Sequence, residues 1–240
     1  MQLTRFSDRI YYLPFEECTD RPNLYYVCGD RYSVAIDAGN SAAHVAAFYE
    51  ALHQEGLAAP RYTLITHWHW DHTFGLHALP TTTQSISTKL TGDKLRQVQE
   101  WTWNREAMKE RELTGDDIAF CNEHILIEYP DLNQIRVAFA NQEIDKPLTL
   151  NPGGVTVTLI PQDSTHSRDA LFIHIPEEEA LFLGDADCED FYDLPCEYDP
   201  ERLKAMIAFL ESIPYKHHFL GHAHPSTKEA ALAMLRSHNK

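Results

Sequence analysis

The chain is short of positive charge and of long apolar runs, and each shortage excludes a class of protein. Its 240 residues carry 20 lysines and arginines against 36 aspartates and glutamates, a formal net charge of −16. A protein that binds nucleic-acid phosphates needs a basic surface, so this balance argues against nucleic acid as a partner. No apolar run approaches the roughly 20 residues that span a bilayer, so we expect no membrane partner either.

Paired cysteines are also missing. The five cysteines are widely scattered and include no Cys-x-x-Cys pair. An odd number without such spacing indicates reduced thiols rather than a disulfide framework. The first eight residues contain no apolar segment of the kind that secretory signals carry. We therefore expect a cytoplasmic protein, and a hydrophobic fraction of 43% is ordinary for a soluble globular chain.

The order of the expected elements indicates an α/β protein. β-prone segments at residues 10–13, 23–28 and 32–37 come first, and a Gly-Asp turn makes the last two a hairpin. An apolar stripe with helical spacing at residues 45–52 predicts a helix. Strands return at 148–150, 155–160, 170–175, 180–183 and 216–220. Asp199 is the expected N-cap of one late helix, and Ser226 with Glu229 forms the expected capping box of the last.

Residues from about 89 to 142 differ from the segments on either side. Residues 93–111 are charged and predict a helix, a second helix is expected near Thr114, and residues 125–129 read as a strand. We interpret this stretch as a helical cap inserted into the domain. Two interpretations stay open: the cap is a lid over a site, or it is a decoration with no role there.

The most informative stretch is the heptapeptide Thr66-His67-Trp68-His69-Trp70-Asp71-His72. Imidazole nitrogens and carboxylate oxygens are the donors that zinc and its first-row neighbours prefer. The β-prone segment before it places these donors on a loop at the carboxyl end of a strand. His67 and His69, two residues apart, can turn to one metal ion, whereas the adjacent Asp71 and His72 are better placed for a second.

Four donors cannot complete two metal shells, so further donors should lie on other strand ends. Three loops that each follow a predicted strand contain them, and the donors are His166, Asp185 and His222. Each is weak evidence alone, because most polar residues after strands are ordinary loop residues. Together, in this order, they form a strong pattern.

With these donors the sequence resembles the metallo-β-lactamase-fold hydrolase superfamily, whose pattern is His-x-His-x-Asp-His, a lone histidine, an aspartate and a last histidine. The resemblance covers nearly the whole chain, including Asp37-x-Gly39. It implies one domain over residues 1–240, built as a four-layer αββα sandwich with the helical insertion at about 89–142. It also implies two divalent metal ions, zinc first, with manganese or iron as alternatives.

The resemblance further implies how the donors divide. One metal ion would take His67, His69 and His166, and Asp185 would bridge to the other ion. The second ion would take Asp71, His72 and His222. Asp71 and Asp185 are then the catalytic carboxylates, Asp71 passing a proton to the leaving group and Asp185 fixing the metal spacing.

Two departures from the family pattern matter. Ser164-Thr165 stands where the family commonly has Pro-Gly before the lone histidine, and threonine lacks the freedom of glycine at positive φ. A different loop geometry is therefore expected there. The long gap from His72 to His166 accommodates the insertion.

We expect a hydrolase in which a hydroxide shared by the metal ions attacks a small ester, thioester, lactone or related substrate. A glyoxalase II or lactonase-like branch fits better than a true β-lactamase, since many of those carry a cysteine where Asp185 stands. Glyoxalase II itself lacks support, because only one helix is expected after His222. An iron oxidoreductase of the sulfur dioxygenase type is the alternative from another class. A degenerate binding protein is a poor third, since all seven donors are present.

A small-molecule substrate is the expected partner, and a homodimer is left open. In the insertion, Trp101 and Arg105 are candidates to line a pocket, with Arg105 pairing with an acidic substrate. Packing of the insertion onto the sandwich is the stronger interpretation of the tryptophan. Tyr192 and His224 are further candidate substrate contacts, although a plain loop histidine is the more probable reading of His224.

Overall fold

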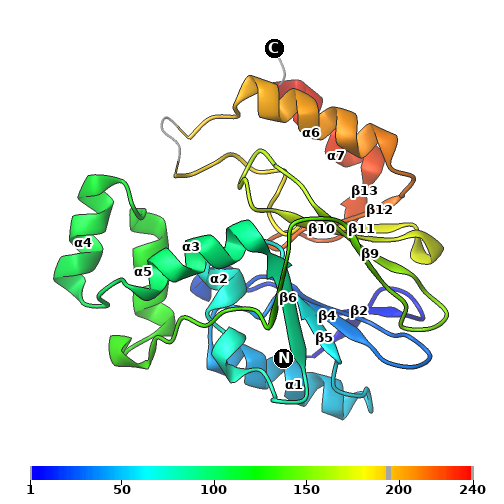
Figure 1. The fold of residues 1–240 in the computed structure, drawn as a ribbon, viewed down its shortest axis with the longest axis horizontal. Coiled ribbons are helices and arrows are strands. Elements are labelled where there is room, and N and C mark those ends of the chain that lie inside the picture. The colour runs from blue at the N-terminus through cyan, green and yellow to red at the C-terminus, as the bar shows by residue number, and fades with distance from the viewer. Residues whose placement is uncertain (1, 193–195, 239–240) are drawn as a thin grey trace.

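A computed structural model gives the fold and describes residues 2–192 and 196–238. Two β-sheets lie face to face in the described part of the chain, with helices on their outer sides (Figure 1). The strands of the first sheet, in spatial order, are β1 (Thr4–Arg5), β2 (Ile10–Leu13), β3 (Leu24–Val27), β4 (Val34–Ile36), β5 (Tyr62–Leu64), β6 (Gln84–Thr88) and β7 (Gln142–Ile144). Strands β4 to β7 run parallel to one another, and the others pair antiparallel.

The second sheet contains one parallel pair. Its strands, in spatial order, are β13 (Ser226–Thr227), β12 (His217–Phe219), β11 (Ala180–Phe182), β10 (Leu171–Ile175), β9 (Val157–Pro161) and β8 (Leu148–Leu150). Strands β11 and β12 are parallel, and their neighbours pair antiparallel. The parallel pair brings the carboxyl ends of β11 and β12 to the same edge.

The helices complete the outer layers. They are α1 (Ala42–Gln54), α2 (Trp70–Thr73), α3 (Lys89–Gln99), α4 (Arg105–Thr114), α5 (Ala119–Glu128), α6 (Pro200–Ser212) and α7 (Lys228–His238), with 3-10 turns η1 (Glu17–Thr19), η2 (Leu76–Ala78), η3 (Leu132–Gln134) and η4 (Pro176–Glu178). In Figure 1, α1 lies below the first sheet and α6 and α7 lie above the second. The predicted αββα sandwich is confirmed.

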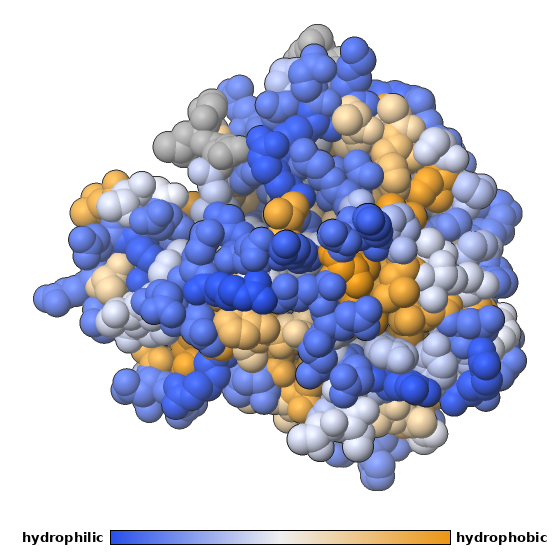
Figure 2. Space-filling view, viewed as in Figure 1, coloured by the Kyte–Doolittle hydropathy of each residue, from blue (hydrophilic) through white to orange (hydrophobic). Residues whose placement is uncertain are grey.

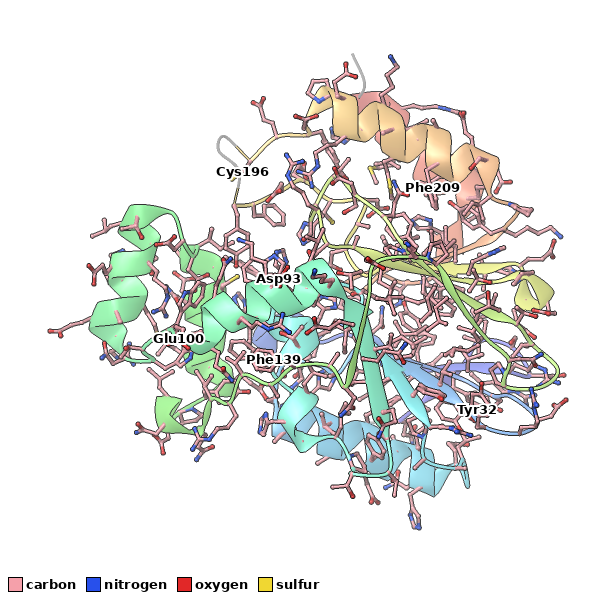
Figure 3. The ribbon with its side chains drawn as sticks, in the orientation of Figure 1. Tyr32, Asp93, Glu100, Phe139, Cys196 and Phe209 are labelled. Atoms are coloured by element: carbon pink, nitrogen blue, oxygen red, sulfur yellow. The ribbon has the colours of Figure 1, made fainter. Side chains whose placement is uncertain are left out.

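The alternation of side chains along β10 shows why the layers stack this way. Leu171, Ile173 and Ile175 join the core between the sheets, whereas Phe172 packs with α6 and α7 on the other face. All of β10 is buried, because each face of the strand has an apolar layer to cover it. The side chains of both sheets fill the space between them, as Figure 3 shows.

The insertion differs from its sequence-based prediction in two places. The helix expected over 93–111 is two helices, α3 and α4, because Asn104 Oδ1 accepts from the Ala107 amide at 2.8 Å and starts a new helix. The strand expected at 125–129 is wrong: this stretch belongs to α5, where Ile125 packs inward. A short apolar run has no periodicity long enough to separate strand from helix.

The last helix starts one residue later than its predicted capping box implies. Ser226 and Thr227 form β13, and Thr227 Oγ1 accepts from the Ala230 amide at 3.2 Å. Thr227 is therefore the N-terminal cap, in the role predicted for Ser226. By contrast, Asp199 caps α6 as expected, accepting from the amides of Glu201 and Arg202.

The surface seen in one view is mostly polar. Figure 2 shows a largely hydrophilic face with small hydrophobic patches. Over residues 2–192 and 196–238, no helix combines the length and the hydropathy needed to cross a bilayer.

Candidate metal centre

The predicted donors converge where the two sheets meet at one edge. The heptapeptide leaves the carboxyl end of β5, His166 lies in the loop between β9 and β10, and Asp185 and His222 follow β11 and β12. The loops are tied together: the Leu171 amide donates to the Thr66 carbonyl at 2.7 Å, and the Gly221 amide donates to the Gly184 carbonyl at 2.9 Å. Tertiary pairing therefore gathers donors that are far apart in the sequence.

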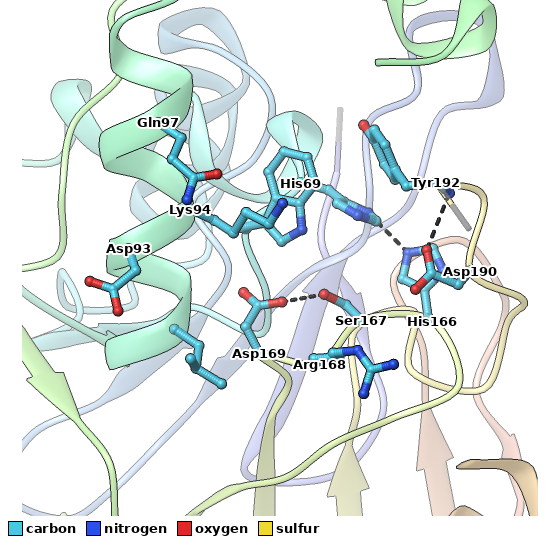
Figure 4. Close-up of a pocket in the computed structure, with 12 residues that line it drawn as sticks. His69, Asp93, Lys94, Gln97, His166, Ser167, Arg168, Asp169, Asp190 and Tyr192 are labelled. Atoms are coloured by element: carbon cyan, nitrogen blue, oxygen red, sulfur yellow. Dashed lines mark hydrogen bonds between the residues drawn. The ribbon is translucent and has the colours of Figure 1, made fainter. Parts of the chain in front are cut away.

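Three histidines form the first cluster, which is fully buried. The ligand atoms of His67, His69 and His166 lie within 4.8 Å of one another. His166 Nε2 is 3.0 Å from His69 Nδ1, and these two side chains face each other in Figure 4. These are the three residues that the resemblance assigned to one metal ion.

The second cluster mixes carboxylates and imidazoles. Its members, again within 4.8 Å of one another, are Asp71, His72, Asp185 and His222. Asp71 Oδ2 lies 2.8 Å from His72 Nε2 and 2.9 Å from His222 Nε2. Asp185 Oδ2 lies 3.2 Å from His72 Nε2 and 3.5 Å from His222 Nε2. Asp185 thus lies with this cluster.

Asp37 orients one donor from each cluster. It accepts from the Thr66 amide at 2.8 Å and from the Thr66 hydroxyl at 2.9 Å, and its Oδ2 is 2.7 Å from His72 Nδ1. The Thr66 hydroxyl lies 3.0 Å from His67 Nδ1. Because that hydroxyl donates to Asp37, it accepts from His67 Nδ1–H, which leaves the lone pair of His67 on Nε2.

The lone pair on His67 Nε2 is the observation that best fits a metal-binding role. This atom is buried and has no hydrogen-bond partner. His166 likewise uses Nδ1 to donate to the Glu189 carbonyl at 2.7 Å, so its Nε2 lone pair faces the cluster. A buried unpaired acceptor is costly, and a bound metal ion would satisfy it. The two donor sets therefore fit the divalent ions that the resemblance implies.

Glycine is needed at two positions, because other side chains of the centre lie too close to the backbone there to leave room for a Cβ. A Cβ on Gly221 would lie 2.5 Å from Asp185 Oδ1 and 2.8 Å from His72 Cε1. Gly184 has a φ of 60°, and a Cβ there would lie 2.4 Å from Thr66 Oγ1. Both positions let one donor loop pack directly on another.

The loop that carries His166 is held by hydroxyl groups. Ser164 Oγ donates to the Ser167 carbonyl at 2.8 Å, and Thr165 Oγ1 donates to the Ala186 carbonyl at 2.8 Å. Thr165 is not among the residues with positive φ, so the loop does not need a glycine there. The departure from the family's Pro-Gly is accommodated by a hydrogen bond to the loop of Asp185.

The two clusters differ in protonation. Burial and the neighbouring imidazoles hold the pKa of His67 and of His69 well below the usual range, so both rings are neutral. Burial opposes charge on His72 and His222 as well, but the carboxylates of Asp71 and Asp185 outweigh it. They raise the pKa of His72 well above its usual value and the pKa of His222 to about 9.

Two cavities open beside the clusters. The main cavity, of about 590 Å³, is lined by five of the seven donors: His69, Asp71, His166, Asp185 and His222. The side cavity, of about 370 Å³, shares His69 and His166 with it and reaches toward α3 (Figure 4). Tyr192 lines both, so this candidate substrate contact lies beside the donors.

The other candidate substrate contacts lie elsewhere. Trp101 packs against the Arg111 guanidinium, 4.5 Å from its ring centre, and lines neither cavity. Arg105 is exposed at the start of α4 and lines neither cavity. His224 is exposed and packs edge-on against Phe15. The insertion tryptophans pack onto the sandwich, which was the stronger interpretation.

Several residues at the centre were missed. Asp37 could have been predicted as part of the site, because it comes at the end of a strand and close to Gly39. The donors also come at the ends of strands. Asp20, in a left-handed conformation with a φ of 53°, lies 3.7 Å from His222 Nδ1. Phe120 and Phe191 line the main cavity. Nothing local in the sequence marks these last three residues.

The fold and the donor pattern define a class of protein. The family model of the metallo-beta-lactamase superfamily matches residues 19–224, and the chain belongs to that superfamily. No curated protein matches the chain.

Solved structures agree on the fold. A metallo-beta-lactamase from Pontibacter korlensis is 14% identical with a TM-score of 0.66, covering 98% of both chains. A mutant metallo-beta-lactamase from Cronobacter sakazakii is 15% identical with a TM-score of 0.70, covering 99% of this chain and 94% of the other. An inverting sec-alkylsulfatase from Pseudomonas sp. is 14% identical with a TM-score of 0.67, covering 98% of this chain and 41% of the other. At such identities the likeness concerns the fold.

Proposed function

We propose that the protein is a dinuclear metal hydrolase, with zinc as the metal, that cleaves a small ester, thioester, lactone or related substrate. The observation that carries the proposal is the pair of adjacent donor clusters that open into one cavity. A cavity of about 590 Å³ is of the size that binds small molecules. Membership of the superfamily supports hydrolysis as the reaction type.

Each cluster has a defined part. His67, His69 and His166 would hold one ion, and Asp71, His72, Asp185 and His222 would hold the other. Bound divalent ions supply a nucleophile at neutral pH by lowering the pKa of water, and they polarise the scissile carbonyl or phosphoryl group. Asp185 Oδ2, close to His72 and His222, would bridge toward the first cluster and so set the spacing of the two sites.

Asp71 is the carboxylate that we assign to proton transfer. It lines the main cavity, and its Oδ2 lies 2.9 Å from His222 Nε2. It can therefore carry a proton from the attacking water to the leaving group while it remains fixed. Asp37 and Thr66 act one step away, by holding the rings of His72 and His67 in the tautomers that face the clusters.

The test is metal content per chain, by mass spectrometry, of protein purified without added metal or chelator, beside Asp185→Asn. About two zinc ions per chain, falling in the variant, are expected. Asp30→Asn, an exposed carboxylate that pairs with Arg9, is the control and should keep both ions. About one iron with little zinc would contradict the proposal and direct attention to thiol and persulfide oxidation.

Activity completes the test. The zinc-loaded protein should hydrolyse at least one member of a panel of esters, thioesters and lactones. Because a structural neighbour is an alkylsulfatase, the panel should also include an alkyl sulfate. Loss of this turnover with a chelator, and its return with zinc, is the expected result.

A further inference from the structure

Apolar side chains, several of them aromatic, form much of the wall of the main cavity outside the donors. Phe15, Phe120 and Phe191 line it together with Ile118 and Leu220. Phe120 is 52% exposed and Phe191 is 41% exposed, which is unusual for phenylalanine in a soluble protein. Exposed aromatic groups that line a cavity are typical of a binding surface.

The two exposed rings come from separate parts of the chain and line the cavity into which the donors open. Phe191 belongs to the loop after Asp185, and its ring packs edge-on against the donor His166 at 5.6 Å. Phe120 is the second residue of α5, in the insertion, and packs against the His124 ring at 4.2 Å. A group that extends from the metal clusters into the cavity would therefore contact apolar rings.

The acidic and basic side chains that line the main cavity are carboxylates and imidazoles. Among the described residues that line it there is no lysine and no arginine, and Glu17 and Asp20 add two carboxylates to those of Asp71 and Asp185. Away from the donors, a substrate carboxylate would lie beside Glu17 and Asp20 with no lysine or arginine among the described lining residues to pair with it. Desolvating an unpaired charge is costly, so such substrates should bind poorly.

The side cavity contains cations, but it contains carboxylates as well. Its two cations, Lys94 and Arg168, share the cavity with the carboxylates of Asp93, Asp169 and Asp190 (Figure 4). Arg168 also pairs with Asp163 at 3.6 Å. Lys94 lies over the Trp68 ring, 5.2 Å from its centre.

We propose that the main cavity selects an uncharged substrate that carries an apolar acyl or aryl group, and that Phe120 and Phe191 determine this specificity. The proposal rests on the hydrolase function proposed above. It replaces the acidic substrate that the sequence suggested through Arg105, because that residue does not line the cavity.

Two esters of the same length test the preference. 4-Nitrophenyl hexanoate ends in a methyl group, whereas mono-4-nitrophenyl adipate ends in a carboxylate. In each, water adds across the acyl–oxygen bond and yields a carboxylic acid and 4-nitrophenol, so one absorbance reports both reactions. We expect kcat/KM for the hexanoate to exceed that for the adipate at least about tenfold. Equal values, or a preference for the adipate that is lost in Lys94→Ala, would overturn the proposal.

Variants locate the specificity. Phe120→Ala and Phe191→Ala should each lower kcat/KM for the hexanoate about tenfold while changing it little for 4-nitrophenyl acetate, whose acyl group is too short to reach the rings. Ile127→Ala is the matched control: Ile127 is also on α5 and 55% exposed, but it does not line the cavity. If both phenylalanine variants behaved like Ile127→Ala, the rings would not determine specificity.

A binding measurement separates this proposal from the hydrolase function. Hexananilide and adipic acid monoanilide are stable amide analogues of the two esters, and calorimetry measures their affinities for the zinc-loaded protein. Tighter binding of hexananilide, weakened in Phe120→Ala, would support the cavity preference even if no ester were hydrolysed. Ester hydrolysis with equal binding of both anilides would leave the hydrolase function standing and refute the preference.

Discussion

The two donor clusters begin on one short segment, with His67 and His69 on the predicted loop but Asp71 and His72 on helix α2, yet they are built on opposite electrostatic principles. His67, His69 and His166 form a cluster of imidazoles in which burial keeps His67 and His69 neutral. In the second cluster, two carboxylates lie within 3.5 Å of His222 Nε2, and charged histidines and aspartates balance one another. The first is short of a cation, whereas the second already contains its own.

This difference shows what each cluster needs from the rest of the protein. The neutral cluster depends on hydrogen bonds that select a tautomer: His67 Nδ1–H donates to the Thr66 hydroxyl, and His166 Nδ1–H donates to the Glu189 carbonyl. The charged cluster depends on Asp37, which adds a third carboxylate beside His72. The first arrangement presents lone pairs to an ion, whereas in the second an ion would have to displace the protons of His72 and His222.

The largest effects should come from removing one donor from each cluster. His67→Ala and His222→Ala should each lower the metal content from about two ions to about one, measured by mass spectrometry. The rate of hydrolysis should fall by more than the roughly 10- to 100-fold that is typical when a residue that hydrogen-bonds to a metal ligand is removed. His53→Ala, an exposed histidine on α1, should change neither quantity. If either variant lost both ions, the clusters would act as one site.

A smaller effect is expected from the carboxylate beneath the donors. Asp37 has a φ of 64°, which asparagine tolerates well, so Asp37→Asn removes the charge and keeps the backbone. We expect metal affinity at the second cluster to fall about 10- to 100-fold, measured by competition with a chelator. The first cluster should retain its ion, and equal weakening of both would erase the distinction drawn between them.

The smallest effect concerns packing under the first cluster. Gly184 and Gly56 have φ values of 60° and 69°, but only Gly184 has a neighbour within 4 Å of an added Cβ. Gly56→Ala should cost roughly 1–2 kcal/mol of unfolding free energy from backbone strain alone. Gly184→Ala should cost more, because the methyl group displaces Thr66, and should also weaken metal binding. Urea unfolding of the metal-free variants measures the difference, and equal losses would show that the Thr66 contact carries no constraint.

Much of the centre could be predicted because its donors are local or follow strands. The spacing within His67 to His72 needs only a loop to bring four donors together, and a donor at a strand end marks His166, Asp185 and His222. The substrate side could not be predicted in this way. Trp101 and Arg105 were chosen by residue type, but the Arg111 side chain packs against Trp101 inside the insertion.

Which residues line the cavity depends on which helices begin or end at the edge of the sheets where the donors lie. Phe120 reaches it because residues 119–128 form α5, the segment in which a strand at 125–129 was predicted. Short apolar runs do not distinguish these structures, since both bury the same residues. Once the helix is in place, its first turn lines the cavity and the face that carries Ile125 packs inward.

By itself the sequence indicated an α/β protein and the seven candidate donors, because apolar periodicity and donor spacing are local properties, and the family resemblance implied the layer order. Only the tertiary structure decided that β11 and β12 run parallel, so that Asp185 and His222 meet, and that Asp37 lies under His72. It alone placed Phe120 and Phe191 at the donors and left lysine and arginine out of the described wall. These features depend on contacts between segments far apart in the chain, which no local pattern encodes.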